Sequence, residues 1–458
     1  MFEKLFKLKK NNTTIKTEII AGITTFMTMA YILAVNPNIL GAAGMDKSAI
    51  LIATALASFI GCLAMAIFAN YPFALAPGMG LNAYFASTVC GIMGIPWQMA
   101  LFAVFIEGII FIVLSVTNVR EAIFNAIPAN LKVAVSGGIG LFIAIIGFIN
   151  ARIAVDAPGT LLKVRDFSEN FHSEGIGAIL ALIGVIITAV LLIRKVKGGI
   201  LFGILATWIL GIIAELTGLY VPNPDESIKM YSTIPDAIVS FNLSPLKLTA
   251  GQAFTGVNFD AIRILDFVVV ILAFLFVDIF DTLGTLIGVS TKADMLDKDG
   301  KLPRIKGALF ADAIATTAGA ALGTSTTTTF VESASGVSEG GRTGLTALTT
   351  GLLFLISIVF SPLFLAIPSF ATAPALIVVG FYMLANVVKI DFDDMSEAIP
   401  AFLCIIAMPF TYSISEGISI GVISYVLINL LTGKFLKKKI SIVMYILAVL
   451  FVLKYIFL

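Results

Sequence analysis

The residues best suited to chemistry lie in FVDIFDTLGTLIG, a stretch inside a long apolar segment. It contains two carboxylates and two hydroxyls, those of Asp278, Asp281, Thr282 and Thr285. Their spacing of i, i+3, i+4 and i+7 places all four on one face of a helix. A charged group in hydrocarbon costs at least about 2.5 kcal/mol, so such residues normally face a cavity or a polar partner. The pattern indicates a polar surface inside a membrane.

Asp281 is the first candidate for ligand binding. Thr282 supplies a hydroxyl beside it, and Gly284 and Gly288 allow close packing of a neighbouring segment. A carboxylate at this depth can accept an N–H group from a ligand, and it can also take up a proton because burial disfavours its charged form. The alternative is a structural carboxylate bonded to another helix. For Asp278, one turn earlier, both interpretations remain open.

Glu332 is the second candidate, in the polar stretch GTSTTTTFVESASG. Consecutive hydroxyls and backbone N–H groups before a short helix offer a polar, slightly positive site. We expect Glu332 about one turn inside a helix of about ten residues, with Thr329 and Phe330 at the site just before it. The alternative is a carboxylate that caps the start of the helix.

Asn82 is the third candidate, in APGMGLNAYF. An amide can donate and accept at once, which suits the edge of a heterocycle, although Asn82 could instead cap a helix. Phe85, Phe26 and Tyr31 could stack on a flat ring. Glu107 is also intramembrane, without a hydroxyl cluster beside it, and we expect it to be structural or a second proton site.

The composition predicts an integral membrane protein. The chain has 458 residues, of which 59% are apolar and only 12% charged. A soluble globular protein has about 25% charged residues. A net charge of +1 gives no indication of nucleic acid binding. Cys62, Cys90 and Cys404 lie in apolar segments without a pairing pattern, so we expect free thiols rather than disulfides or metal ligands.

Apolar windows of about 20 residues predict the membrane spans. In the first half they lie near 17–37, 47–70, an interrupted 75–93, 97–117, 131–150, 174–194 and 198–218. In the second half they lie near 264–290, 305–321, an interrupted 326–338, 342–365, 371–388, 397–413 and 415–433. The third segment of each half is broken. Paired interruptions at matching places in two halves indicate the binding site of a transporter.

Seven segments in each half give the two halves opposite orientations. The chain then divides into an N-terminal piece, a first repeat, a loop, a second repeat and a C-terminal piece: 1–16, 17–218, 219–263, 264–433 and 434–458. With the N-terminus in the cytoplasm, 21 of the 29 Lys and Arg residues fall on the cytoplasmic side and 7 outside, as the positive-inside rule requires. Residues 440–457 could form a fifteenth span or a helix lying along the membrane.

At APGMGLNAYF, FVDIFDTLGTLIG and TSTTTTFVESASGVSEGGRTGLTAL the chain resembles the azaguanine-type purine permeases. These are a branch of the nucleobase–cation symporter (nucleobase–ascorbate transporter) family. The resemblance covers about residues 5–435. It implies an all-α polytopic fold of fourteen segments in two inverted repeats, with a short strand before half-helices 3 and 10 and an extra C-terminal apolar helix. A core domain (segments 1–4 and 8–11) would move against a gate domain (segments 5–7 and 12–14).

The resemblance implies proton-coupled uptake of purine nucleobases across the plasma membrane by alternating access. Hypoxanthine and guanine are the first expectation and adenine the second. By position, the binding carboxylates of the eighth and tenth segments fall on Asp281 and Glu332, and the polar residue of the third falls on Asn82. We expect no cofactor, and the coupling proton on Asp281, Glu332, Asp278 or Glu107. Members of the family often form dimers through the gate domain.

Two other classes of function are alternatives. An anion transporter or channel on the same fold, as in the sulfate and borate carriers, is disfavoured by two buried carboxylates. A membrane-embedded enzyme needs a nucleophile–base pair or a metal set, whereas the single histidine, His172, falls in a loop. The sequence contains no phosphate-binding Walker motif that would suggest an ATP-driven pump. We therefore expect a transporter and not an enzyme.

Overall fold

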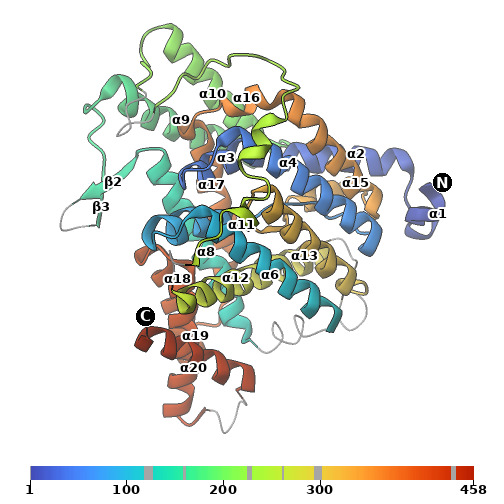
Figure 1. Ribbon diagram of the computed structural model, residues 1–458, viewed down its shortest axis with the longest axis vertical. Coiled ribbons are helices and arrows are strands. Elements are labelled where there is room, and N and C mark those ends of the chain that lie inside the picture. Colours follow the sequence, from blue (N-terminus) through green and yellow to red (C-terminus); the bar gives the residue numbers. More distant parts are fainter. Residues whose placement is uncertain are drawn as a thin grey trace.

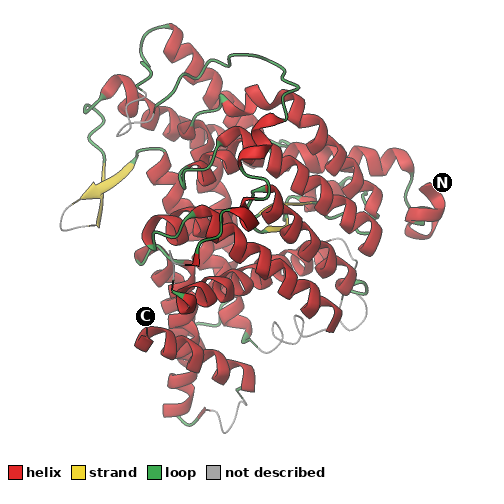
Figure 2. Cartoon of the chain, viewed as in Figure 1, coloured by secondary structure: helices red, strands yellow, loops and turns green. Residues whose placement is uncertain are grey.

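The computed structural model describes residues 2–117, 127–157, 161–223, 230–259, 263–292, 295, 302–434 and 440–457. Most of this part of the chain is helical, with two short pairs of strands (Figure 2). Within it, 11 helical stretches are long and apolar enough to cross a membrane. A shorter apolar helix, Met395–Phe410, and two interrupted segments complete the fourteen segments that the sequence predicts.

The first half contains six helical spans and one interrupted segment. The spans are α2 (Ile15–Met29) continued by α3 (Ile32–Gly41), α4 (Lys47–Ala64) extended by a π-helical turn (Met65–Ala69), α6 (Trp97–Thr117), α8 (Ala129–Asn150), α9 (Ile176–Ile193) and α10 (Gly199–Leu216). The interrupted segment is β1 (Leu75–Pro77), α5 (Met79–Ala83) and a π-helix (Tyr84–Ile92). The first span is therefore longer than predicted and broken at a turn.

The second half repeats this order (Figure 1). Its spans are α12 (Ile264–Lys292), α13 (Ile305–Leu322), α15 (Gly344–Ser357) with α16 (Ser361–Leu365), α17 (Ser369–Leu384), α18 (Met395–Phe410) and α19 (Ile414–Leu431). Its interrupted segment is β4 (Thr327–Thr329) followed by α14 (Ser333–Ser338). Because seven is odd, the second half crosses the membrane in the opposite direction. The predicted all-α fold of two inverted repeats is confirmed.

The two interrupted segments pair with each other. Strands β1 and β4 are antiparallel, with Ala76 opposite Thr328. The backbone N–H of Gly78 donates to the Thr326 carbonyl at 3.0 Å, and the N–H of Phe330 donates to the Ala74 carbonyl at 3.0 Å. Unpaired backbone groups inside a membrane cost several kcal/mol each, so two extended pieces at this depth are stable because each supplies the other's partners.

The strand pairing corrects one prediction about α14. The bond from Phe330 to Ala74 keeps the chain extended beyond β4, and the helix begins only at Ser333. Glu332 therefore occupies the N-cap position instead of a place one turn inside the helix, and the helix has 6 residues instead of about ten. The strand partner lies far away in the sequence, so local spacing did not indicate it.

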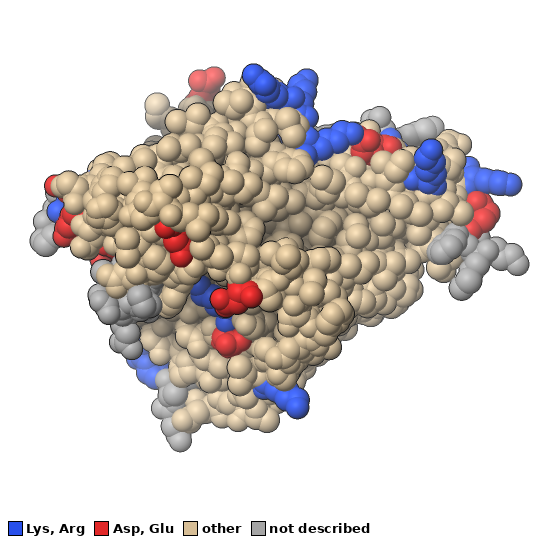
Figure 3. Space-filling view, turned by 90° about the horizontal axis from the view of Figure 1, so that it is seen from above, with Lys and Arg blue, Asp and Glu red and all other residues tan. Residues whose placement is uncertain are grey.

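The helices pack in two groups. In one group α13 packs on α4 and α6, and α15 packs on α2 and α4. In the other, α17 and α18 pack on α8, while α10 packs on α9 and α17. Figure 3 shows broad continuous areas of one face without charged side chains, as a lipid-facing surface requires. The predicted core and gate domains would move against each other, and this movement stays a prediction. The predicted domain boundaries also stay predictions.

A further helix, α20 (Ile442–Phe457), follows the last span. It packs on α19, and its Tyr455 hydroxyl donates to the carboxylate of Glu416 in the first turn of α19. Since α20 starts shortly after α19 ends, it runs back along the length of α19. Figure 1 shows it ending across the molecule from the N-terminus. Of the two alternatives for residues 440–457, this arrangement favours a spanning helix.

Candidate functional site

Asp281 lies on α12 beside the paired strands. Its side chain is half-buried, and its carboxylate accepts a hydrogen bond from the hydroxyl of Thr328 on β4. Gly78, which precedes α5, faces the same carboxylate. A Cβ at Gly78 would lie 3.3 Å from Asp281 Oδ2 and 2.5 Å from the Thr328 methyl carbon, so a glycine is needed for this close approach. The carboxylate is thus held against both interrupted segments.

Glu332 approaches the same region from α14. Its side chain is half-buried, and its Oε1 accepts a hydrogen bond of 2.6 Å from the hydroxyl of Tyr31. Although Glu332 is the N-cap residue of α14, its side chain makes no capping hydrogen bond. Asp281 is close enough to Glu332 for the two charges to interact. Two partly accessible carboxylates therefore lie in the same region, beside the paired interrupted segments.

Thr282 joins three further polar residues. Its hydroxyl lies 2.9 Å from Asp278 Oδ1, 2.7 Å from Asp312 Oδ1 and 2.9 Å from Thr328 Oγ1. All four side chains are buried, in contrast to the half-buried Asp281 one helical turn from Asp278. Asp278 and Thr282 thus form part of the wall behind Asp281, on the α13 side.

Asp312 was not among the residues predicted from the sequence. It is the single carboxylate of the apolar helix α13, which also carries hydroxyls at Thr316 and Thr317 one turn later. The signal that could have found it is the general cost of an ionisable residue inside a membrane span, which makes each one a functional candidate. Its contact of 2.7 Å with the hydroxyl of Thr282, the residue after Asp281, places Asp312 in the same region.

Asn82 and Glu107 are engaged with the threonine-rich run before β4. Asn82 is fully buried, and its Oδ1 accepts a hydrogen bond from the Ser325 hydroxyl. Glu107 is also fully buried, and its Oε2 accepts a hydrogen bond of 2.8 Å from the Thr326 hydroxyl. The structure therefore gives Glu107 the hydroxyl neighbour that its own sequence surroundings lack. Ligand binding by Asn82 and proton binding by Glu107 stay predictions.

The remaining predicted residues are distributed around this region. Phe85 is fully buried beside Phe274, with ring centroids 6.3 Å apart. Phe26 is half-buried and packs edge-to-face on Phe354 with centroids 5.2 Å apart. Phe330 is buried, and Thr329 is buried with a hydroxyl that has no hydrogen-bond partner among the described residues. Stacking of a ligand ring on Phe26 or Phe85 stays a prediction.

The site lies where the two groups of helices meet. Glu332 is close enough to Tyr382 on α17 for its charge to affect the Tyr382 hydroxyl, and α17 belongs to the other helix group. The immediate partners of the two half-buried carboxylates are hydroxyls, those of Tyr31 and Thr328. Such a site offers hydrogen-bond acceptors at two positions. It suits a small neutral ligand with N–H donors, and it would repel an anion.

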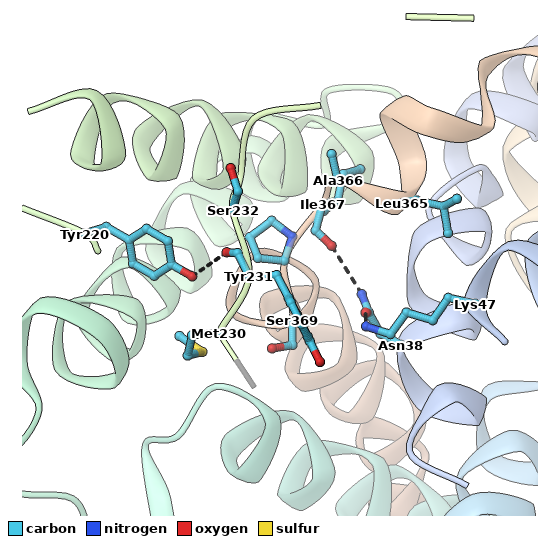
Figure 4. Close-up of a pocket in the computed structure, with 11 residues that line it drawn as sticks. Asn38, Lys47, Tyr220, Met230, Tyr231, Ser232, Leu365, Ala366, Ile367 and Ser369 are labelled. Carbon is cyan, nitrogen blue, oxygen red and sulfur yellow. Dashed lines mark hydrogen bonds between the residues drawn. The ribbon is translucent and has the colours of Figure 1, made fainter. Parts of the chain in front are cut away.

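A small cavity lies apart from this site, between α3, α4 and the chain before α17. Its volume is about 50 Å³. Figure 4 shows Asn38 between Lys47 and the segment at Ile367. Lys47 Nζ donates to Asn38 Oδ1 at 2.9 Å, and Asn38 Nδ2 donates to the Ile367 carbonyl at 3.3 Å. Asn38 binds both Lys47 and the Ile367 carbonyl, so we interpret this cavity as a packing space between segments.

Two inverted repeats, each broken at its third segment and joined by those breaks, define a secondary transporter. Residues 16–420 match the sequence profile of the Permease family (Xan_ur_permease). The chain therefore belongs to this family, and it is a transporter and not an enzyme.

Known proteins resemble the chain over nearly its full length. It is 45% identical over 462 residues to the guanine/hypoxanthine permease PbuG of Bacillus subtilis, covering 99% of each chain. It is 41% identical over 458 residues to the adenine permease AdeP of Escherichia coli, covering 100% of this chain and 96% of the relative. The transmembrane domain of the cyanobacterial bicarbonate transporter BicA superposes with a TM-score of 0.61 at 14% identity, covering 89% of this chain and 97% of that one. The last likeness shows a shared fold.

Proposed function

We propose that the protein takes up purine nucleobases together with protons across the plasma membrane. Hypoxanthine and guanine are the preferred substrates, and adenine is the second choice. The N-terminus lies in the cytoplasm, where the Lys and Arg residues are concentrated. The relatives named for guanine, hypoxanthine and adenine support this substrate class.

The observation that carries the proposal is the pair of half-buried carboxylates at the broken segments. Asp281 and Glu332 approach the same space from α12 and α14, beside the strand pair that joins the two halves of the chain. A purine base is planar and neutral, and it carries N–H donors on more than one edge. Each carboxylate can accept an N–H group, and charge-assisted hydrogen bonds of this kind are about twice as strong as neutral ones.

The surrounding residues complete the proposed binding site. Asp281, Glu332 and Asn82 bind the polar edges of the base, with Thr282 and Thr329 as neighbouring hydroxyls. Phe330, Phe85 and Phe26 supply apolar contacts. The coupling proton binds among Asp281, Glu332, Asp278 and Glu107. Neutralising a carboxylate lowers the cost of moving it through a low-dielectric interior, which is how proton binding would permit the loaded state to change conformation.

Alternating access requires that one helix group moves against the other with the base held between them. In this proposal the core contains segments 1–4 and 8–11, and the gate contains segments 5–7 and 12–14. A homodimer through the gate domain would anchor the gate while the core moves. The electrostatic interaction between Glu332 and Tyr382 of α17 acts across the boundary at which this movement would occur.

The alternative is an anion transporter or channel on the same fold. We retain this alternative because the chain shares its fold with a bicarbonate transporter. The described partners of Asp281 and Glu332 are hydroxyls and other carboxylates, with which an anion would make no favourable charge interaction.

Uptake of labelled bases in cells without their own purine permeases tests the proposal. We expect saturable, proton-dependent uptake of hypoxanthine that guanine inhibits and sulfate does not. Asp281→Asn and Glu332→Gln should each reduce uptake at least about tenfold, because each removes a charge-assisted bond. Asp166→Asn and Glu169→Gln are matched controls, since they make the same chemical changes at exposed positions of a loop. Full uptake by either site variant would contradict the site, and uptake of sulfate or bicarbonate instead of purines would contradict the function.

A further inference from the structure

Tyr31 lies at the turn between α2 and α3, where the first span is broken. Its side chain is fully buried. The backbone N–H groups of Ala34 and Val35 both donate to the Tyr31 carbonyl, at 3.0 and 2.9 Å, so α3 starts at this residue. The backbone of Tyr31 is therefore fixed by the helix that follows, and its ring presents no open face for stacking on a ligand.

The Tyr31 hydroxyl is directed at the candidate site. It donates to Glu332 Oε1 at 2.6 Å, and it is close enough to Asp281 for an electrostatic interaction. A neutral donor bonded to Glu332 stabilises this carboxylate beside Asp281 without introducing a cation. A hydrogen bond to an ionised carboxylate is stronger than one between neutral groups, so this bond favours one orientation of the Glu332 side chain.

The helix that carries Glu332 is held by the same span. Gly336 of α14 lies so close to α2 that a Cβ on it would be 2.6 Å from the Ala21 carbonyl oxygen. The Thr28 hydroxyl also lies 3.5 Å from the carbonyl oxygen of Glu332. The first span thus fixes the backbone of Glu332 through α2 and its carboxylate through Tyr31.

We propose that Tyr31 is a positioning residue, which holds the Glu332 carboxylate in the orientation that binds the substrate. This inference rests on the proposed function, because it takes the transported base as the ligand of Glu332. Tyr31 itself does not touch the base. The Glu332 side chain has several rotatable bonds. Because Tyr31 already restricts it, Glu332 loses less conformational entropy when the substrate binds.

The variant Tyr31→Phe removes the hydroxyl and keeps the ring. We expect the KM for uptake of labelled hypoxanthine, and the Kd for its binding to purified protein, to rise about tenfold. Vmax per folded transporter should stay within about twofold, since the movement of the loaded protein is unchanged. The control is Tyr71→Phe, which removes another buried hydroxyl, one that accepts a hydrogen bond from the Arg304 backbone N–H away from the site. It should leave KM and Kd within about twofold.

A double-mutant cycle separates positioning from a general structural role. If Tyr31 acts through the Glu332 carboxylate, Tyr31→Phe in a Glu332→Gln background should change Kd by less than about twofold. An undiminished effect in that background would overturn the inference, and so would an unchanged KM in Tyr31→Phe when the wild type transports hypoxanthine. A wild type that transports no purine would overturn the proposed function itself. The two failures are therefore distinct.

Discussion

At the scale of single residues, neighbouring carboxylates on one helix have different surroundings. Asp281 is half-buried and reaches Thr328, whereas Asp278, one turn earlier, is fully buried and is bonded to Thr282. Thr282 also contacts Asp312 on α13. The hydroxyl of Thr282 carries one hydrogen and can therefore donate to only one acceptor at a time. The other contacts of the Thr282 oxygen can be hydrogen bonds only if the neighbouring residue donates to it. The hydrogen positions of these residues therefore depend on one another.

Replacing Thr282 by valine should destabilise the protein. The variant keeps the shape of the side chain but removes the hydroxyl that Asp278, Asp312 and Thr328 share. We expect a loss of about 1–3 kcal/mol, the usual cost of removing one partner of a buried hydrogen bond. Thermal unfolding of the purified protein in detergent measures it. The matched control Thr255→Val alters an exposed threonine and should have little effect. Equal stability of Thr282→Val and wild type would contradict this account of the cluster.

The sequence indicated the candidate residues that differ in polarity from their surroundings. Asp281 and Glu332 were identifiable because carboxylates next to hydroxyl groups are unusual in apolar segments. Their partners were not identifiable. Tyr31 and Glu332 are 301 positions apart in the chain, and Thr282 and Asp312 come from different helices. Such contacts depend on how the spans pack, and a span's own composition contains no information about its neighbours.

At the scale of elements, hydropathy predicted the spans because a membrane-crossing helix must be apolar over about 20 residues. It did not predict the pairing of β1 with β4. That pairing decides where α14 begins, and hence why Glu332 is an N-cap residue. Proline and glycine in one segment and consecutive threonines in the other indicated interruptions, but which extended piece pairs with which is a property of the three-dimensional arrangement.

An ion pair outside the spans gives a pH-dependent contribution to stability. Asp394 is the N-cap of α18, and its Oδ1 lies 2.5 Å from Lys434 Nζ, just after α19. The hydrogen bond from Lys434, with those from Ser396, lowers the pKa of Asp394 from 3.8 to about 2. Since the pKa is lower in the folded state, the contribution is complete at neutral pH. It is lost as the pH falls from about 4 to about 2.

Asp394→Asn keeps an N-cap residue and removes the charge. We expect it to lower stability at pH 7 by less than about 1 kcal/mol, because the pair is largely exposed. The difference from wild type should shrink as the pH falls below about 4, and thermal unfolding of both proteins across this range measures it. Lys434→Gln should have the same effect and add nothing to Asp394→Asn. A difference that stays constant with pH would exclude the ion pair as its source.

At the scale of the whole molecule, the two inverted halves explain why the site is central. Each half contributes one broken segment, and the breaks meet at the strand pair beside α12. The additional helix α20 lies outside this symmetry. It packs along α19, and its Phe451 ring lies 6.0 Å from that of Phe276 on α12. It thus contacts one helix of the proposed core, α12, and one helix of the proposed gate, α19, and movement of the core against the gate would have to accommodate it.

The central claim is that a purine base binds between Asp281 and Glu332, beside the paired strands. The most direct measurement is an experimental structure of the purified protein with the transported base bound. We predict planar density within hydrogen-bonding distance of both carboxylates, and a Tyr31 hydroxyl still bonded to Glu332. A base bound elsewhere, for example in the cavity beside Asn38 and Lys47, with Asp281 and Glu332 free of it, would contradict the account.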